Sequence, residues 1–195
     1  MRQRHEQLES LAKLFEHAEK QVKKAEDVNG SIVVPSINEL RYFGYHIVKA
    51  LLAEDDETTL AKEIEKAAGH AKRAIYDASE ALIIYYLEKA ESFQERHANS
   101  DSITEILPNY VEYLKKLAQI NKKIAFIRDD GEAYKYRDRY YQKTLPYIDE
   151  LNEIVSTFDE ANHLIVKKDR KKARNFILVF LTLVATVLGL ALSLS

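Results

Sequence analysis

The last 21 residues constrain this chain more than any other part of it. Residues 175–195, NFILVFLTLVATVLGLALSLS, contain no charged side chain. As an α-helix rising 1.5 Å per residue, about 20 residues match the hydrocarbon core of a bilayer, which is about 30 Å thick. The alternative is a buried core helix, but an apolar surface all round a helix suits lipid better. We therefore predict a single C-terminal transmembrane helix.

The segment before it, residues 167–174, carries six basic residues and one acid, a net charge of +5. Lysine and arginine this close to a membrane helix predict that the flanking domain is cytoplasmic, which here means a single-pass protein of a cell inner membrane. Anionic headgroups are the expected partner, at about 1 kcal/mol per basic residue. The predicted membrane-surface residues are Lys167, Lys168, Arg170, Lys171, Lys172 and Arg174.

The rest of the chain indicates an all-α fold. Only five glycines and three prolines occur in 195 residues, which favours long helices. We predict a bundle of about five helices in residues 1–166, a basic collar in 167–174 and the membrane helix in 175–195. The chain has no cysteine, which excludes disulfides, thiolate metal sites and a cysteine nucleophile. No cofactor or metal is expected.

Hydrophobic periodicity places the helices of the bundle. Ser36 with Glu39, and Ser102 with Glu105, have the spacing of capping boxes that open two of them. Gly69 is a point where the third helix could kink. The expected helices cover residues 3–27, 37–53, 58–96, 102–127 and 132–168.

The first candidate for chemistry is Arg41 with His46 in the second expected helix. Their R-x4-H spacing resembles the signature of HEPN proteins, all-α domains found in many antiviral and toxin ribonucleases. The resemblance implies a metal-independent endoribonuclease in which the motif pairs across a dimer. In such an enzyme the histidine assists attack by a ribose 2′-hydroxyl, and the arginine stabilises charge on the phosphate.

Two arguments from the residues bear on this motif. Arg41 and His46 are five positions apart, about 140° around a helix, so only an oligomer could make them converge. Outside the basic collar the chain carries a net charge of −7, which opposes RNA binding. The alternative is structural: an arginine paired with acids and a histidine packed in the bundle.

A second polar group occupies neighbouring turns of the third expected helix. Its members could meet Arg41 and His46 across a helix seam and form a polar site. Structural pairing along a charged helix face is the alternative. These residues are His70, Arg73, Tyr76 and Asp77.

The last helix of the bundle, in which Pro146 could introduce a kink, carries a stripe at heptad spacing. Packing within the bundle and self-association both explain this pattern. The stripe consists of Ile148, Leu151, Val155, Phe158, Asn162 and Ile165.

Small residues recur every three or four positions in the predicted membrane helix. Such a face lets helix backbones approach closely, so it can mediate oligomerisation or line a narrow pore. The predicted oligomerisation and pore residues are Thr182, Ala185, Thr186, Gly189 and Ser193.

Together these features predict a membrane-anchored, homo-oligomeric helical effector that perturbs or permeabilises the bilayer. The resemblance to HEPN proteins places it in prokaryotic antiviral defence of the CRISPR-accessory type. Two alternatives stay open. One is a membrane-tethered ribonuclease using Arg41 and His46, for which RNA would be the substrate. The other is a tail-anchored adaptor without activity that binds a cytosolic protein.

Overall fold

The computed structural model describes the backbone of residues 2–53, 56–129 and 137–193, and the side chains of 5–53, 56–127 and 140–188. Every regular element in these ranges is an α-helix, which confirms the predicted all-α fold. The helices are α1 (Arg2–Asn29), α2 (Val34–Leu52), α3 (Glu57–Arg96), α4 (Ile103–Ile106), α5 (Tyr110–Asp129) and α7 (Arg137–Ser193).

The predicted capping box at Ser36 is wrong. Helix α2 begins three residues earlier than expected, because Pro35 fits the first turn, where no backbone N–H is needed. The N-cap is Val33, which makes no side-chain capping bond. Ser36 is fully buried, and its Oγ donates a hydrogen bond to the carbonyl of Ala74 over 3.1 Å.

The predicted capping box at Ser102 is also wrong. Ser102 precedes α4 but makes no side-chain capping bond, and the helix ends after one turn. Leu107 is extended (φ −119°, ψ 82°) because Pro108 disfavours helical geometry in the residue before it. Glu105 does not cap a helix. It binds Lys168 and Lys172, each at 2.5 Å.

Two expected interruptions leave their helices continuous. Helix α3 runs through Gly69 over 40 residues, and α7 runs through Pro146 over 57 residues. Both predicted domain boundaries, 166/167 and 174/175, fall inside α7. Among the residues that the structure describes, no helix is long and apolar enough to cross a membrane. The membrane helix therefore stays a prediction.

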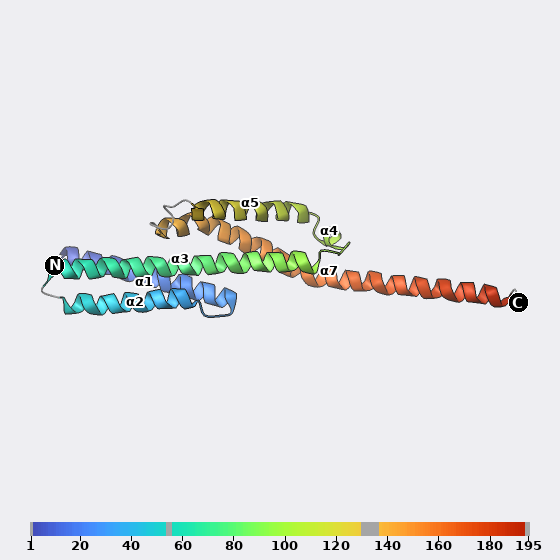
Figure 1. Cartoon of the computed structure of the whole chain (residues 1–195), viewed down its shortest axis with the longest axis horizontal. Helices are drawn as coiled ribbons and strands as arrows, with labels where there is room; N and C mark the ends of the chain where they lie inside the picture. The colour runs from blue at the N-terminus through green and yellow to red at the C-terminus, as the bar shows by residue number, and fades with distance from the viewer. Residues whose placement is uncertain (1, 54–55, 130–136, 194–195) are drawn as a thin grey trace. The chain divides into compact units, whose positions relative to one another are not determined.

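Contacts divide the chain into two compact units, and α3, α5 and α7 each contribute to both. The first unit consists of Met1–Glu88 and Leu117–Asn152. In this unit α1, α2 and the first part of α3 lie side by side (Figure 1), with the Phe15 ring 4.6 Å from the Phe43 ring. Small side chains on α3 allow close approach of its neighbours. They form a seam of fully buried alanines, Ala67, Ala71, Ala74 and Ala78.

The second unit consists of Lys89–Lys116 and Glu153–Ser195. Its core is aromatic: the Phe93 and Phe158 rings stack with centroids 4.3 Å apart, and the Tyr110 and Tyr113 rings lie against Phe158. Offset ring pairs of this kind add about 0.5–1.5 kcal/mol beyond the area that they bury.

The heptad stripe on α7 is buried by the chain itself. Its five apolar members are each at most 6% exposed. Asn162 Oδ1 accepts a hydrogen bond from His97 Nε2 over 2.8 Å. Of the two explanations for the stripe, the structure supports packing within the bundle.

Candidate functional site

Helices α2 and α3 are joined by a short connection, and they bring two similar patterns together. Each helix carries a glutamate followed by a histidine seven positions later: Glu39 and His46 on α2, Glu63 and His70 on α3. Seven residues are close to two helical turns, so each pair lies on one face of its helix. Because the helices run antiparallel, the glutamate of one lies beside the histidine of the other.

The two histidines are held by these crossed pairs. His46 Nδ1 donates to Glu63 Oε2 over 2.5 Å, and His70 Nδ1 lies 2.7 Å from Glu39 Oε2. Both imidazoles are mostly buried, with side chains 12% and 15% exposed. A carboxylate on Nδ1 fixes the orientation of a histidine ring and leaves Nε2 as the nitrogen available for other chemistry.

Two cations complete the charge balance around the carboxylates. Hydrogen bonds from Lys66 and His46 lower the pKa of Glu63 to about 2. Burial raises the pKa of Glu39, but hydrogen bonds from His70 and Arg73 outweigh that effect, so its pKa lies below the ordinary value. Both carboxylates are therefore ionised near neutral pH.

His70 has two alternative hydrogen-bonding states. Its Nδ1 lies 2.5 Å from Arg73 Nη2 as well as 2.7 Å from Glu39. An arginine can only donate, so Nδ1 bonds to Glu39 when protonated and to Arg73 when unprotonated. In either state Arg73 Nε donates to Glu39 over 2.7 Å.

Four rings form a ladder along the α2–α3 seam. The His46 and His70 rings stack with centroids 5.0 Å apart and an interplanar angle of 16°. Tyr42 stacks on His70 at 5.4 Å, and Tyr45 meets His46 edge-on at 5.2 Å. The ladder and the ion pairs hold α2 against α3.

Arg41 lies over Tyr42, at one end of the ladder. Its side chain is exposed, and its guanidinium lies 5.3 Å from the centroid of the Tyr42 ring. His46 faces Glu63. The predicted ribonuclease pair is thus directed to different neighbours within one chain.

The members of the second predicted group, which comprises His70, Arg73, Tyr76 and Asp77, also contact different neighbours. His70 stacks on His46, and Arg73 binds Glu39 in the structural pairing that was the alternative. Tyr76 instead packs its ring against Tyr140, with centroids 4.7 Å apart.

The sequence predictions do not identify the glutamates as partners of the histidines. The spacing of Ser36 and Glu39 predicts a capping box instead, and Glu63 belongs to none of the predicted sites. The shared seven-residue spacing to a histidine on two consecutive helices was the signal that could have identified both. No cluster of three or more metal-ligating side chains occurs among the described residues.

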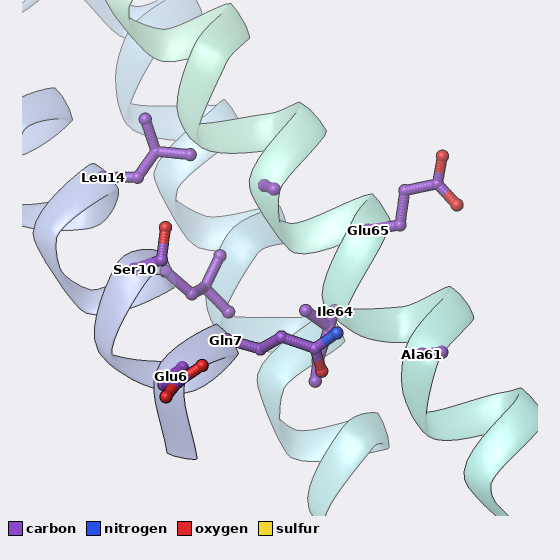
Figure 2. A pocket seen from close by; sticks show the side chains of 9 residues that line it. Glu6, Gln7, Ser10, Leu14, Ala61, Ile64 and Glu65 are labelled. Carbon is purple, nitrogen blue, oxygen red and sulfur yellow. The ribbon is translucent and has the colours of Figure 1, made fainter. Parts of the chain in front are cut away.

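A separate groove lies between α1 and α3, with a volume of about 510 Å³. Leu11, Leu14 and Ile64 supply its apolar lining. Figure 2 shows Gln7 extending from α1 toward Ile64, while Glu65 points away from α1. Four of the nine lining residues are polar or charged: Glu6, Gln7, Ser10 and Glu65.

The predicted membrane-surface and pore residues all lie on α7. In the collar, Lys168 and Lys172 hold Glu105. Every collar cation except Lys168 is exposed, namely Lys167, Arg170, Lys171, Lys172 and Arg174. Beyond the collar, Thr182, Ala185 and Thr186 are also exposed. The side chains of Gly189 and Ser193 lie outside the described residues.

No protein-family model, curated protein or solved structure matches the chain. The resemblance to HEPN proteins therefore stays an expectation that depends on Arg41 and His46.

Proposed function

We propose that the protein is a membrane-anchored helical effector whose α7 inserts its apolar end into a bilayer and whose assembled copies perturb that bilayer. The observation that carries this proposal is the exposure of the apolar end of α7. All its large apolar side chains between Phe176 and Leu188 are 39–73% exposed. Each gains about 1.5–3 kcal/mol on full transfer out of water, so an exposed run of this length needs an apolar partner. Lipid supplies that partner on every side of the helix.

Hydrogen bonding within the helix supports the same proposal. Thr182 Oγ1 donates to the carbonyl of Leu178 over 2.8 Å, and Thr186 Oγ1 donates to the carbonyl of Thr182 over 2.9 Å. Lipid offers no hydrogen-bond partner, so a polar group within it has to be satisfied by the protein. Both hydroxyls meet this requirement without a second helix.

The proposed orientation follows from the collar. Its five exposed cations stand at the start of the apolar segment, where anionic headgroups would meet them. This orientation places the acidic bundle in the cytoplasm of a prokaryotic cell, the setting that the resemblance to HEPN proteins implies. Perturbation of the bilayer follows from self-association through Ala185, Gly189 and Ser193, which recur every four residues and permit close helix contact.

The test uses full-length protein mixed with vesicles that contain anionic lipid and a trapped dye. The wild type should resist alkaline extraction from the vesicles and release the dye. Leu181→Lys should lose both properties, because a lysine at the centre of a membrane helix costs about 2.5–3.5 kcal/mol. Val111→Lys, an equally exposed apolar position on α5, is the matched control and should behave as wild type.

A second variant separates insertion from perturbation. Gly189→Leu should stay inserted but change the rate of dye release, because the added side chain prevents close helix contact. Dye release that is identical in the wild type and Gly189→Leu would refute the assembly part of the proposal. Retention of Leu181→Lys in extracted vesicles would refute the anchor itself.

The geometry of one chain gives no support to the ribonuclease alternative, because His46 is engaged by Glu63 and Arg41 lies over Tyr42. The adaptor alternative would be favoured by protein that inserts into vesicles without releasing their dye.

A further inference from the structure

Helix α2 is apolar on two opposite faces. One face packs inside the first unit, through Ser36, Phe43 and Ala50. The opposite face, which we call the outer face of α2, is exposed. An exposed apolar stripe on a helix of this kind is suited to contact with another apolar surface. The outer face consists of Val34, Ile37, Arg41, Tyr45, Val48 and Leu52.

We infer that the outer face of α2 binds the same face of a second copy of this chain, with the two helices antiparallel. Its residues recur every three or four positions, so they form one stripe along the helix that can pack against another helix. This interface is formed by residues of the first unit, whereas the apolar end of α7 belongs to the second unit. It does not depend on the proposed membrane insertion.

The size of the apolar surface fits a protein interface. Eight large apolar side chains on or beside the outer face are 42–83% exposed, several hundred Å² in total. A standard interface takes about 800 Å² from each partner, and these side chains are the apolar part of what α2 offers toward that area. They are Ile32, Val34, Ile37, Tyr42, Tyr45, Val48, Leu51 and Leu52.

The order of residues along the face makes four of its six members self-complementary, and it sets Ile37 and Val48 opposite the partner's Lys49 and the partner's Asn38. A two-fold axis beside residue 43 places Val34 opposite the partner's Leu52, and Arg41 opposite the partner's Tyr45. Arginine over a tyrosine ring is an attractive pair. In a parallel pair each residue would face the same residue of the second copy, so the two Arg41 guanidiniums would meet and repel. Lys49, beside the face, places its Nζ 4.8 Å from the centroid of the Tyr45 ring. A parallel pair would bring both Arg41 and Lys49 against their own counterparts, whereas the antiparallel arrangement separates each cation from its counterpart along the helix.

Gly44 lies at the edge of the same face, one position from the axis. A Cβ added there would meet no atom within 4 Å in the single chain, so the backbone is open to a neighbour. The same open space makes Gly44 a harmless place for a reporter side chain. The natural chain has no cysteine, so one introduced thiol is unique.

The test is thiol cross-linking of full-length protein, diluted in mild detergent. Gly44→Cys should give a covalent dimer with a short bifunctional linker, because the two positions lie on one edge of the interface, close to the axis. Val34→Cys alone should give no covalent dimer, because the two copies of position 34 lie about 27 Å apart along the antiparallel helices. A mixture of Val34→Cys and Leu52→Cys proteins should form the mixed dimer.

Matched charge variants show whether the face itself is responsible. Val48→Glu in the Gly44→Cys background should reduce the cross-linked dimer by about tenfold or more, because a carboxylate would be buried in an apolar interface. Val111→Glu should leave it unchanged, since Val111 has the same side chain at nearly equal exposure, 54% against 56%.

Each other outcome refutes the antiparallel dimer. Efficient cross-linking of Val34→Cys alone would indicate a parallel pair. Equal cross-linking with and without Val48→Glu would exclude the outer face. A dye on Gly44→Cys that is quenched by lipid-borne quenchers would indicate that this face lies on a membrane. The proposed anchor is tested separately, since Val48→Glu should still resist extraction from vesicles.

Discussion

At the residue scale, the unusual groups are the two carboxylates that hold the histidine pair. Glu63 is buried beside Lys66 and His46, and its pKa falls from an ordinary value of 4.5 to about 2. A carboxylate with a lowered pKa stabilises the fold while it is ionised. That stabilisation is complete above pH 4.5 and disappears as the pH falls toward 2.

The first prediction concerns Glu63→Gln. At pH 6–7 this variant should unfold at lower urea concentration than the wild type, because a neutral amide binds Lys66 and His46 more weakly. The difference in unfolding free energy should shrink below pH 4.5 as the wild-type carboxylate gains its proton. Urea titrations between pH 7 and pH 2.5 measure it. Glu95→Gln, at an exposed position on the same helix, should show little effect, and a constant difference down to pH 2.5 would contradict this account.

At the element scale, a helix boundary depends on whether its potential capping side chains are bonded to a neighbouring helix instead. Serine and glutamate three positions apart have the form of a capping box, yet Ser36 is buried against α3, and Glu39 pairs with His70 and Arg73. A tertiary partner replaces the local one because burying an unsatisfied polar group costs more than leaving a helix end exposed to water.

The second prediction contrasts two glycines. Gly69 lies inside α3, where an added Cβ would come only within 3.4 Å of the flexible end of Arg73. Gly69→Ala should stabilise the protein by about 0.5–1 kcal/mol, because alanine loses less backbone entropy in a helix. Gly30 ends α1 with φ of 65°, a backbone conformation that disfavours alanine.

Gly30→Ala should therefore destabilise the protein by about 1 kcal/mol. Thermal unfolding followed by circular dichroism measures both changes. A lower melting temperature for Gly69→Ala would show that its Cβ disturbs the Arg73–Glu39 pair more than it favours the helix.

At the scale of the whole molecule, charge is distributed unequally along the chain. The collar carries +5 and the remainder −7. If the collar meets anionic headgroups, binding to vesicles should fall as salt is raised, since surface charges are screened over about 10 Å at 0.1 M salt.

The third prediction tests this with a triple variant, Arg170→Gln, Lys171→Gln and Arg174→Gln. At about 1 kcal/mol for each basic residue, its binding to anionic vesicles should fall on the order of a hundredfold. Vesicle co-sedimentation measures the change. The same three changes at Lys115, Lys116 and Lys122, exposed lysines on α5, should cost much less. An equal loss in both variants would indicate that only total charge matters.

The sequence by itself determined the helical class, the limits of α1 and α3, and the segments that carry charge or none. These properties depend on local composition and on periodicity along the chain. Only the tertiary structure decided that Ser36 is buried, that Glu63 holds His46, that Arg41 faces solvent, and that α2 has an uncovered outer face. These depend on which residues distant in sequence come together, and a pattern along one helix does not specify what packs against it.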